Sequence, residues 1–247
     1  TEDMIDWRLT RKQRKIDVGI LSAPEIRFEI ISDGAGPQKV SVRDGRINYN
    51  GSLYDELVFD GRTRSTLFEE PSFILYDVVI GVGFHWQRKI TEKFAGSLRF
   101  IVEDGKITAI NRIGVENYLL SVIGSEMKAT APLEYLKAHS VISRSWVMSH
   151  IGHRAEAQTT GKTADRTTDQ TTAQTTGKTA DRTTADGIPV LIKWWDHDDH
   201  ANFDVCADDH CQRYQGLTMA VGDNVRKAID QTWGQVLTSG GEICDTR

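Results

Sequence analysis

The chain has 247 residues, of which 39% are hydrophobic and 26% are charged, enough to bury one sizeable core or two small ones. Its formal net charge of −5 argues against a dominant role in nucleic-acid binding, because phosphate recognition needs a basic surface. Three cysteines are too few for a disulfide-dense scaffold. No apolar run is long enough to predict a transmembrane segment, and the first residues lack the pattern of a signal peptide.

The first half of the chain has the pattern of β-strands. Two stretches carry a central Asp-Gly pair, Asp44-Gly45 and Asp104-Gly105. A type I′ turn needs positive φ at both central positions, so each pair predicts an antiparallel hairpin. The strand-like stretches are residues 15–21, 26–30, 39–48, 73–84 and 98–110.

The apolar period then changes from that of a strand to that of a helix. Residues 115–123 have apolar side chains three to four positions apart and predict a short helix that Gly124 ends. Pro132 suits the first position of a second helix, which is expected to run to about His150.

A low-complexity repeat follows the second predicted helix. The sequence TTGKTADRTT occurs at residues 159–168 and again at 175–184. Between residues 155 and 186 the only apolar side chains are alanines, too little apolar surface to offset the entropy of ordering. The segment is therefore interpreted as an exposed, flexible insertion. A short repeat structure is the alternative, although two copies are too few for a solenoid.

The predicted fold class is α+β, with antiparallel hairpins and with helices on either side of Glu126. Residues 1–14 form an amino-terminal tail, and the insertion divides one domain into parts at 15–154 and 187–247. The second part is expected to contain strands at 188–192 and 235–237 and a helix within 216–230.

Glu126 is the first candidate for chemistry, since it lies between the two predicted helices, beside Met127. A general acid needs a carboxyl group whose pKa is raised by a partly apolar setting, which a junction of two amphipathic helices can supply. The alternative is an ordinary helix cap or a solvated side chain.

Lys137 and Arg144 form the second candidate. They are seven residues apart, so both are expected on one face of the second helix. Arg144 could hold a sugar carboxylate or the ionised Glu126. The alternative is an ordinary charged surface stripe.

A possible metal site occupies the stretch DHDDHANFDVCADDHC, residues 196–211. Two thiolates and two imidazoles make a tetrahedral zinc set. The preferred ligands, with His197 or an aspartate as a substitute for one, are His200, Cys206, His210 and Cys211. Four protein ligands would close the shell, so zinc would be structural. The alternatives are a disulfide between the two cysteines or two unpaired thiols.

Several motifs together resemble the stage II sporulation protein D and LytB family. The main one is VENYLLSVIGSEMKATAPLEYLKAHSVISRSWVMSH at residues 115–150. GSLRF at 96–100, VCADDHCQRYQG at 205–216 and TWGQVLTSGGEICDTR at 232–247 occur in the same order. The resemblance spans residues 15–247.

The resemblance implies a peptidoglycan lytic transglycosylase that cleaves between N-acetylmuramic acid and N-acetylglucosamine and leaves a 1,6-anhydro sugar. It implies that Glu126 is the catalytic acid/base, with Lys137 and Arg144 as basic partners. Tyr214 and Gln212 are expected to bind substrate, although core packing is the alternative for the aromatic ring. It also implies zinc at the Cys-His-Cys stretch and no cofactor for catalysis.

The substrate implies a location in the bacterial cell envelope and glycan strands as partners. The LytB side of the resemblance gives a second function, a non-catalytic glycan-binding enhancer of a cell-wall amidase. A third is a zinc-stabilised structural domain. The resemblance also predicts a serine- and glycine-rich segment after Arg247, so the second part of the domain is expected to be truncated.

Overall fold

The computed structural model describes residues 13–61, 68–81, 85–128, 130–160, 200–208, 210–217 and 222–246, without the side chains of 152–160. The chain divides into two compact units, Thr1–Ile151 with His200–Arg247, and Gly152–Asp199. Only the end of one helix is described in the second unit. Most of the predicted tail and insertion, the strand at 188–192 and His197 therefore lie outside the described residues.

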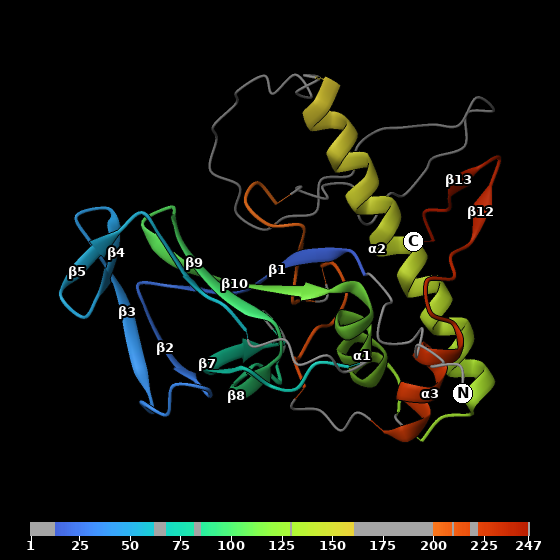
Figure 1. Ribbon diagram of the computed structural model, residues 1–247, viewed down its shortest axis with the longest axis horizontal. Coiled ribbons are helices and arrows are strands. Elements are labelled where there is room, and N and C mark those ends of the chain that lie inside the picture. The colour runs from blue at the N-terminus through green and yellow to red at the C-terminus, as the bar shows by residue number, and fades with distance from the viewer. Residues whose placement is uncertain are drawn as a thin grey trace, which may run out of the picture. The chain divides into compact units, whose positions relative to one another are not determined.

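The first unit is an α+β fold made mostly of strands, which confirms the predicted fold class at that level (Figure 1). One sheet has the order β11-β1-β10-β9-β6. Its members are β11 (Val205–Cys206), β1 (Lys15–Ala23), β10 (Lys106–Gly114), β9 (Ser97–Glu103) and β6 (Glu56–Phe59).

A second sheet has the order β5-β4-β3-β2-β7-β8. Its members are β5 (Ser52–Tyr54), β4 (Arg46–Tyr49), β3 (Gln38–Arg43), β2 (Glu25–Ile30), β7 (Phe73–Ile80) and β8 (Arg88–Phe94). Strand β7 ends at Ile80, earlier than the predicted end at Phe84.

Both Asp-Gly hairpins are confirmed. Strands β3 and β4 pair around Asp44-Gly45, and β9 and β10 pair around Asp104-Gly105. All four turn residues have positive φ, between 49° and 72°, as a type I′ turn requires.

Aromatic rings fill the space between the two sheets. Phe28 of β2 lies 5.1 Å from Phe59 of β6 and 5.1 Å from Phe100 of β9, measured between ring centroids. Edge-to-face and tilted contacts of this kind stabilise a core beyond the area they bury. A second series of rings, Phe73, Phe94, Tyr214 and Tyr118, continues the core toward the helices.

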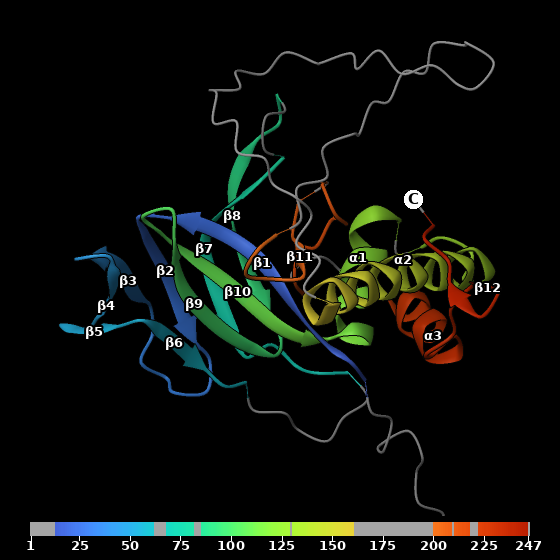
Figure 2. The ribbon, with the colours of Figure 1, turned by 90° about the horizontal axis from the view of Figure 1, so that it is seen from above.

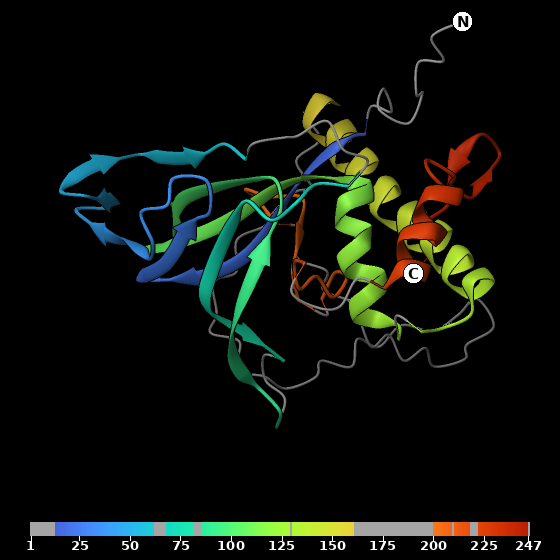
Figure 3. The same ribbon diagram turned by 60° about the horizontal axis from the view of Figure 1, so that its bottom comes forward.

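The described helices are α1 (Val115–Glu126), α2 (Leu133–Thr160) and α3 (Asp223–Gln231). They lie on the same side of the sheets (Figures 2 and 3). Gly124 does not end α1 as predicted, because the helix continues to Glu126. Helix α2 also continues past His150 and takes in the first residues of the predicted insertion.

The carboxyl-terminal part contains the helix predicted within 216–230, which is α3 and begins at Asp223, and it differs from the prediction after this helix. Residues 235–237 are not a strand, and the only strands after α3 in the described residues are β12 (Thr238–Ser239) and β13 (Glu242–Ile243), which pair with each other. Within the described residues, no helix combines the length and apolar character that crossing a membrane requires.

Candidate functional site

Glu126 is the last residue of α1, at the point where the chain turns toward α2. Met127 caps the helix in an extended conformation and donates its backbone N–H to Ile123. The Tyr135 hydroxyl of α2 donates to Met127 Sδ at 3.1 Å. These contacts of Met127 therefore fix the backbone at the neighbouring Glu126.

Two other segments contact the Glu126 carboxyl group. His139 Nε2, on α2, lies 2.9 Å from Glu126 Oε2. The backbone N–H of Arg213 donates to Glu126 Oε1 at 3.3 Å. The Glu126 side chain remains 26% exposed. It is thus held from α1, α2 and the segment after the second cysteine, and stays accessible to a ligand.

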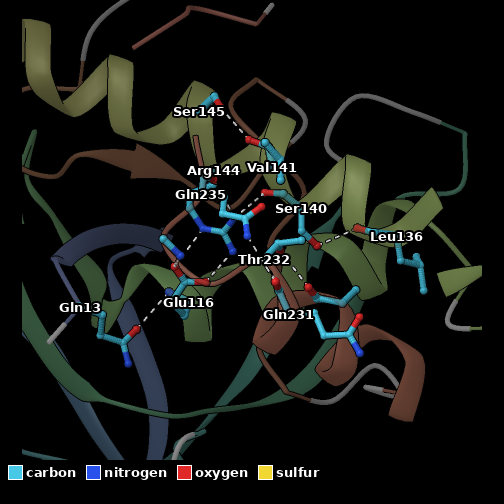
Figure 4. A network of polar contacts seen from close by, with 12 residues as sticks. Gln13, Glu116, Leu136, Ser140, Val141, Arg144, Ser145, Gln231, Thr232 and Gln235 are labelled. Carbon is cyan, nitrogen blue, oxygen red and sulfur yellow. Dashed lines mark hydrogen bonds and ion pairs between the residues drawn. The ribbon is translucent and has the colours of Figure 1, made fainter. Parts of the chain in front are cut away.

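Arg144 is directed to Glu116 and makes no contact with Glu126 (Figure 4). Its Nε and Nη2 donate to the two Glu116 carboxylate oxygens at 2.9 and 2.6 Å. Its Nη1 donates to the carbonyl oxygens of Ser140 and Gln235. Arg144 is 1% exposed, so the contacts that it makes join α1, α2 and the segment after α3.

Lys137 and Arg144 are both on α2, but Lys137 is partly exposed whereas Arg144 is buried. Lys137 Nζ pairs with the exposed carboxylate of Glu134 at 3.0 Å, and the Lys137 side chain is 28% exposed. The spacing of seven predicted one common face for both residues. That face is buried at Arg144 and partly open at Lys137, and the role of Lys137 toward a substrate stays a prediction.

Tyr214 and Gln212 are buried in the core. The Tyr214 hydroxyl donates to Asn111 Oδ1 at 2.6 Å, and its ring stacks on Tyr118. Burial raises the pKa of Tyr214 well above its ordinary value. Gln212 Oε1 accepts from the Tyr118 hydroxyl and its Nε2 donates to the Ser143 carbonyl. These contacts agree with the core-packing alternative for Tyr214 rather than with an exposed sugar platform.

The segment from Asp204 to Leu217 is fixed to the rest of the unit by its backbone. Strand β11 runs parallel to β1. The N–H of Ala207 donates to Gly19, that of Gln215 to Ser121 Oγ at 2.8 Å, and that of Leu217 to Lys93 at 2.7 Å. These bonds position Arg213 beside Glu126.

Gly216 makes this close approach possible. Its φ is +58°, and a Cβ there would lie 2.3 Å from the carbonyl oxygen of Lys93. A side chain at this position would therefore strain the backbone and push the segment away from β8.

This segment and the residues just before it bring together four side chains that could hold a metal ion. They are those predicted from the sequence: His200, Cys206, His210 and Cys211. One ligand atom from each lies within 4.8 Å of the others.

The separations within this cluster fit a common tetrahedral centre. Cys211 Sγ lies 3.5 Å from His200 Nε2 and 3.5 Å from His210 Nδ1, and Cys206 Sγ lies 3.7 Å from the latter. Sulfur and nitrogen ligands at ordinary zinc bond lengths are about 3.6 Å apart on a tetrahedron. Hydrogen bonding from Cys211 first, and then from His200, lowers the pKa of the Cys206 thiol. Cys206 and Cys211 form no disulfide in the structure.

A cavity of about 140 Å³ lies beside this segment. Residues of β1 and β7, together with Cys206, Arg213 and Tyr214, contribute to its lining. Trp86 also lines it and is 37% exposed, so the cavity reaches the surface.

Glu92 of β8 lines the same cavity and is 1% exposed. Neither of its carboxyl oxygens has a hydrogen-bond partner among the described residues. Burial raises the pKa of Glu92 to about 8.

Comparison with known proteins agrees with the resemblance read from the motifs. Residues 103–239, more than half of the chain, match the model of the family described as SpoIID, stage II sporulation protein. The chain belongs to the SpoIID family. Membership of this family supports a function related to sporulation or the cell wall. The matched residues include Glu126, Arg144 and the four members of the His/Cys cluster.

One curated relative adds a more local similarity. It is an uncharacterized protein of Brachyspira hyodysenteriae, 36% identical over 59 residues. The aligned stretch covers 24% of the chain and 16% of the relative. No solved structure matches the chain.

Three parts of this SpoIID site were missed by reasoning from the sequence: His139, the backbone N–H of Arg213, and Glu92. A helical spacing could have indicated the first, since Tyr135 and His139 are one turn apart and face Met127 and Glu126 respectively. Alternation could have indicated Glu92, which shares a strand face with Ile90 and Phe94. No local signal identifies the Arg213 N–H, because its position depends on where the segment before α3 folds back.

Glu92 predicts a measurable pH dependence of stability. Between about pH 4.5 and 8 the carboxyl group is protonated in the folded chain and ionised in the unfolded chain, so the free energy of unfolding falls as pH rises through this window. Glu92→Gln removes this titration. The decline between pH 5 and pH 8, measured by urea unfolding, is expected to be about 2–4 kcal/mol smaller in the variant. Equal declines in the two proteins would contradict the assignment.

Proposed function

We propose that the chain is a peptidoglycan lytic transglycosylase in which Glu126 is the single acid/base. The observation that carries the proposal is the placement of Glu126 at the α1–α2 junction, partly exposed and held by His139 and the Arg213 N–H. This arrangement supports proton transfer by a fixed carboxyl group that a ligand can reach. SpoIID membership supports the choice of a cell-wall glycan as substrate.

The proposed reaction needs one carboxyl group because the substrate provides the nucleophile. Glu126 donates its proton to the glycosidic oxygen as the bond to muramic acid C1 breaks. The 6-hydroxyl oxygen of the same muramic acid forms the new bond to C1, and its proton goes to the Glu126 carboxylate. An ordinary glycosidase uses a second carboxyl group to attack or to activate water. Here the intramolecular hydroxyl has a high effective concentration, so neither step is required.

His139 and Arg213 would stabilise the ionised form of Glu126 between the two proton transfers. The N–H groups that they can direct at the carboxylate oxygens supply hydrogen bonds to the charged state. Arg144 contributes from a distance, since its contacts with Glu116, Ser140 and Gln235 fix α1 against α2. Lys137 remains the candidate for direct contact with substrate, because its side chain is partly exposed.

The experiment for this function is incubation of purified glycan strands, with and without stem peptides, followed by mass spectrometry. New 1,6-anhydromuramic ends are the expected product. Glycan binding without any new ends would favour the alternative, an enhancer of a separate cell-wall amidase. Reducing ends in place of anhydro ends would show hydrolysis and contradict the proposed chemistry.

We also propose that the His/Cys cluster binds zinc in a structural role. The donor set and the separations of about 3.6 Å fit tetrahedral zinc, and four protein ligands leave no open position for water. The ion would tie His200, just before β11, to the loop that positions Arg213. Zinc therefore supports the site by holding this segment in place.

Removal of the metal is expected to lower the melting temperature of the chain by about 5–10 °C, because loss of the cluster frees residues 200–217. Cys206→Ser should have the same effect as a chelator. Cys244→Ser is the matched control, since this third cysteine lies outside the cluster. The measurements are metal content by mass spectrometry and melting by calorimetry. Purified protein without zinc, or unchanged melting after verified removal, would contradict a structural ion.

A further inference from the structure

The Glu92 carboxyl group has no role in the proposed reaction and no partner among the described residues. Buried polar groups are nearly always hydrogen-bonded, and an unpaired one costs about 1–3 kcal/mol. Both Glu92 oxygens are buried and have no hydrogen-bond partner within the described part of the chain, and the residue lines a cavity that reaches the surface at Trp86. A group with this geometry can bind a ligand that enters the cavity.

Arg213 connects the cavity to the candidate catalytic group. It is one of the lining residues, its guanidinium lies over the Trp86 ring at 5.6 Å, and its backbone N–H contacts Glu126. A substituent in the cavity can therefore belong to a molecule that also reaches Glu126. This links the cavity to the glycan, so the inference rests on the proposed function.

We propose that Glu92 and this cavity form a subsite for the acetamido group of one sugar of the glycan. A volume of about 140 Å³ is large enough to admit an acetamido group, since a cavity of about 150 Å³ holds a benzene molecule. Val78 and Ile80 are among the lining residues and offer apolar surface to the methyl group. A neutral Glu92 carboxyl group donates its O–H to the acetamido carbonyl oxygen, and its own carbonyl oxygen accepts from a neighbouring hydroxyl or N–H.

A cationic ligand fits the cavity less well. Burial keeps Glu92 neutral at pH 7, because its pKa is about 8. The other charged or titratable groups that line the cavity are Cys206, Asp208, Arg213 and Tyr214. Among these groups, the positive charge of Arg213 offsets the negative charge of Asp208, and zinc would neutralise the Cys206 thiolate. An ammonium group would therefore enter without a strong opposite charge, whereas a neutral amide needs none.

The test measures binding to two forms of the same glycan. Glycan strands without stem peptides are prepared fully N-acetylated and also de-N-acetylated, and titrations use the full chain carrying Glu126→Gln so that no cleavage occurs. This Glu126→Gln chain is the parent, and it is compared with two double variants that also carry Glu92→Gln or Glu92→Leu. Glutamine keeps one donor and one acceptor. Leucine removes both and leaves no unpaired polar group, so it is expected to fold at least as stably.

The subsite predicts that the parent binds the N-acetylated strands at least 10-fold more tightly than the de-N-acetylated ones. Glu92→Gln should keep this preference, and Glu92→Leu should lose it with its melting temperature maintained. Unchanged binding in Glu92→Leu would overturn the subsite and leave the proposed function standing. Tighter binding of de-N-acetylated strands, lost in Glu92→Gln, would overturn it in favour of an ammonium ligand. A parent that binds neither strand would overturn the proposed function and the subsite together.

Discussion

Glu126→Gln is expected to reduce the rate of glycan cleavage by about 10³-fold or more, within the range that a positioned acid/base contributes. The amide cannot transfer a proton, but it can still accept from the Arg213 N–H and contact His139. Folding and glycan binding should therefore persist. The measurement is the rate at which anhydromuramic ends appear, with melting and glycan binding recorded on the same samples.

The matched control for this loss is Glu25→Gln. Glu25 is an exposed glutamate at the start of β2, paired with Lys39 and outside the candidate site. Its amide variant should cleave at a rate close to that of the unchanged chain. Comparable activity in Glu126→Gln, or an equal loss in the control, would contradict the role of Glu126 as acid/base.

Arg144→Met is expected to lower the free energy of unfolding by about 3–5 kcal/mol. The substitution leaves the Glu116 carboxylate buried without its bidentate partner, and it removes the donors to the Ser140 and Gln235 carbonyls. Urea unfolding monitored by fluorescence and circular dichroism gives the difference.

Two comparisons separate charge burial from loss of packing. The double variant Glu116→Gln/Arg144→Met carries no unpaired charge and should lose less stability than Arg144→Met alone. Lys137→Met breaks an exposed pair on the same helix and should change the free energy by about 1 kcal/mol at most. A single variant Arg144→Met within 1 kcal/mol of the unchanged chain would show that the pair does not hold the helices.

The hairpins could be predicted because their signals are local. Asp44-Gly45 and Asp104-Gly105 satisfy the backbone requirement of a type I′ turn by themselves, and the flanking alternation sets the register. The end of α1 could not be predicted in this way. Gly124 is a common helix terminator, but α1 packs against the core over most of its length and continues two residues beyond it.

The candidate site was only partly accessible from the sequence. Glu126 and the four members of the His/Cys cluster lie in recognisable motifs, and the cluster is local enough that spacing predicts its assembly. Arg144 shows the limit of such reasoning. Helical spacing places it on one face with Lys137. It does not show that α1 and the segment after α3 cover that face at Arg144.

Glu92 was missed because its strand was missed. It lies in β8, which is not among the predicted strand-like stretches, and it alternates there with Ile90 and Phe94, so it shares their face of the strand. Gly216 and Leu217, more than a hundred residues later, fold against the neighbouring Lys93 carbonyl and close off that position. Alternation along a strand indicates which residues share a face, but not what a distant segment places over it.

The most direct measurement of the central claim is mass spectrometry of glycan ends after incubation of N-acetylated strands with the chain and with Glu126→Gln in parallel. The account predicts new 1,6-anhydromuramic ends with the unchanged chain and none above background with the variant. Equal amounts of these ends from both proteins would contradict the claim that Glu126 performs the proton transfers.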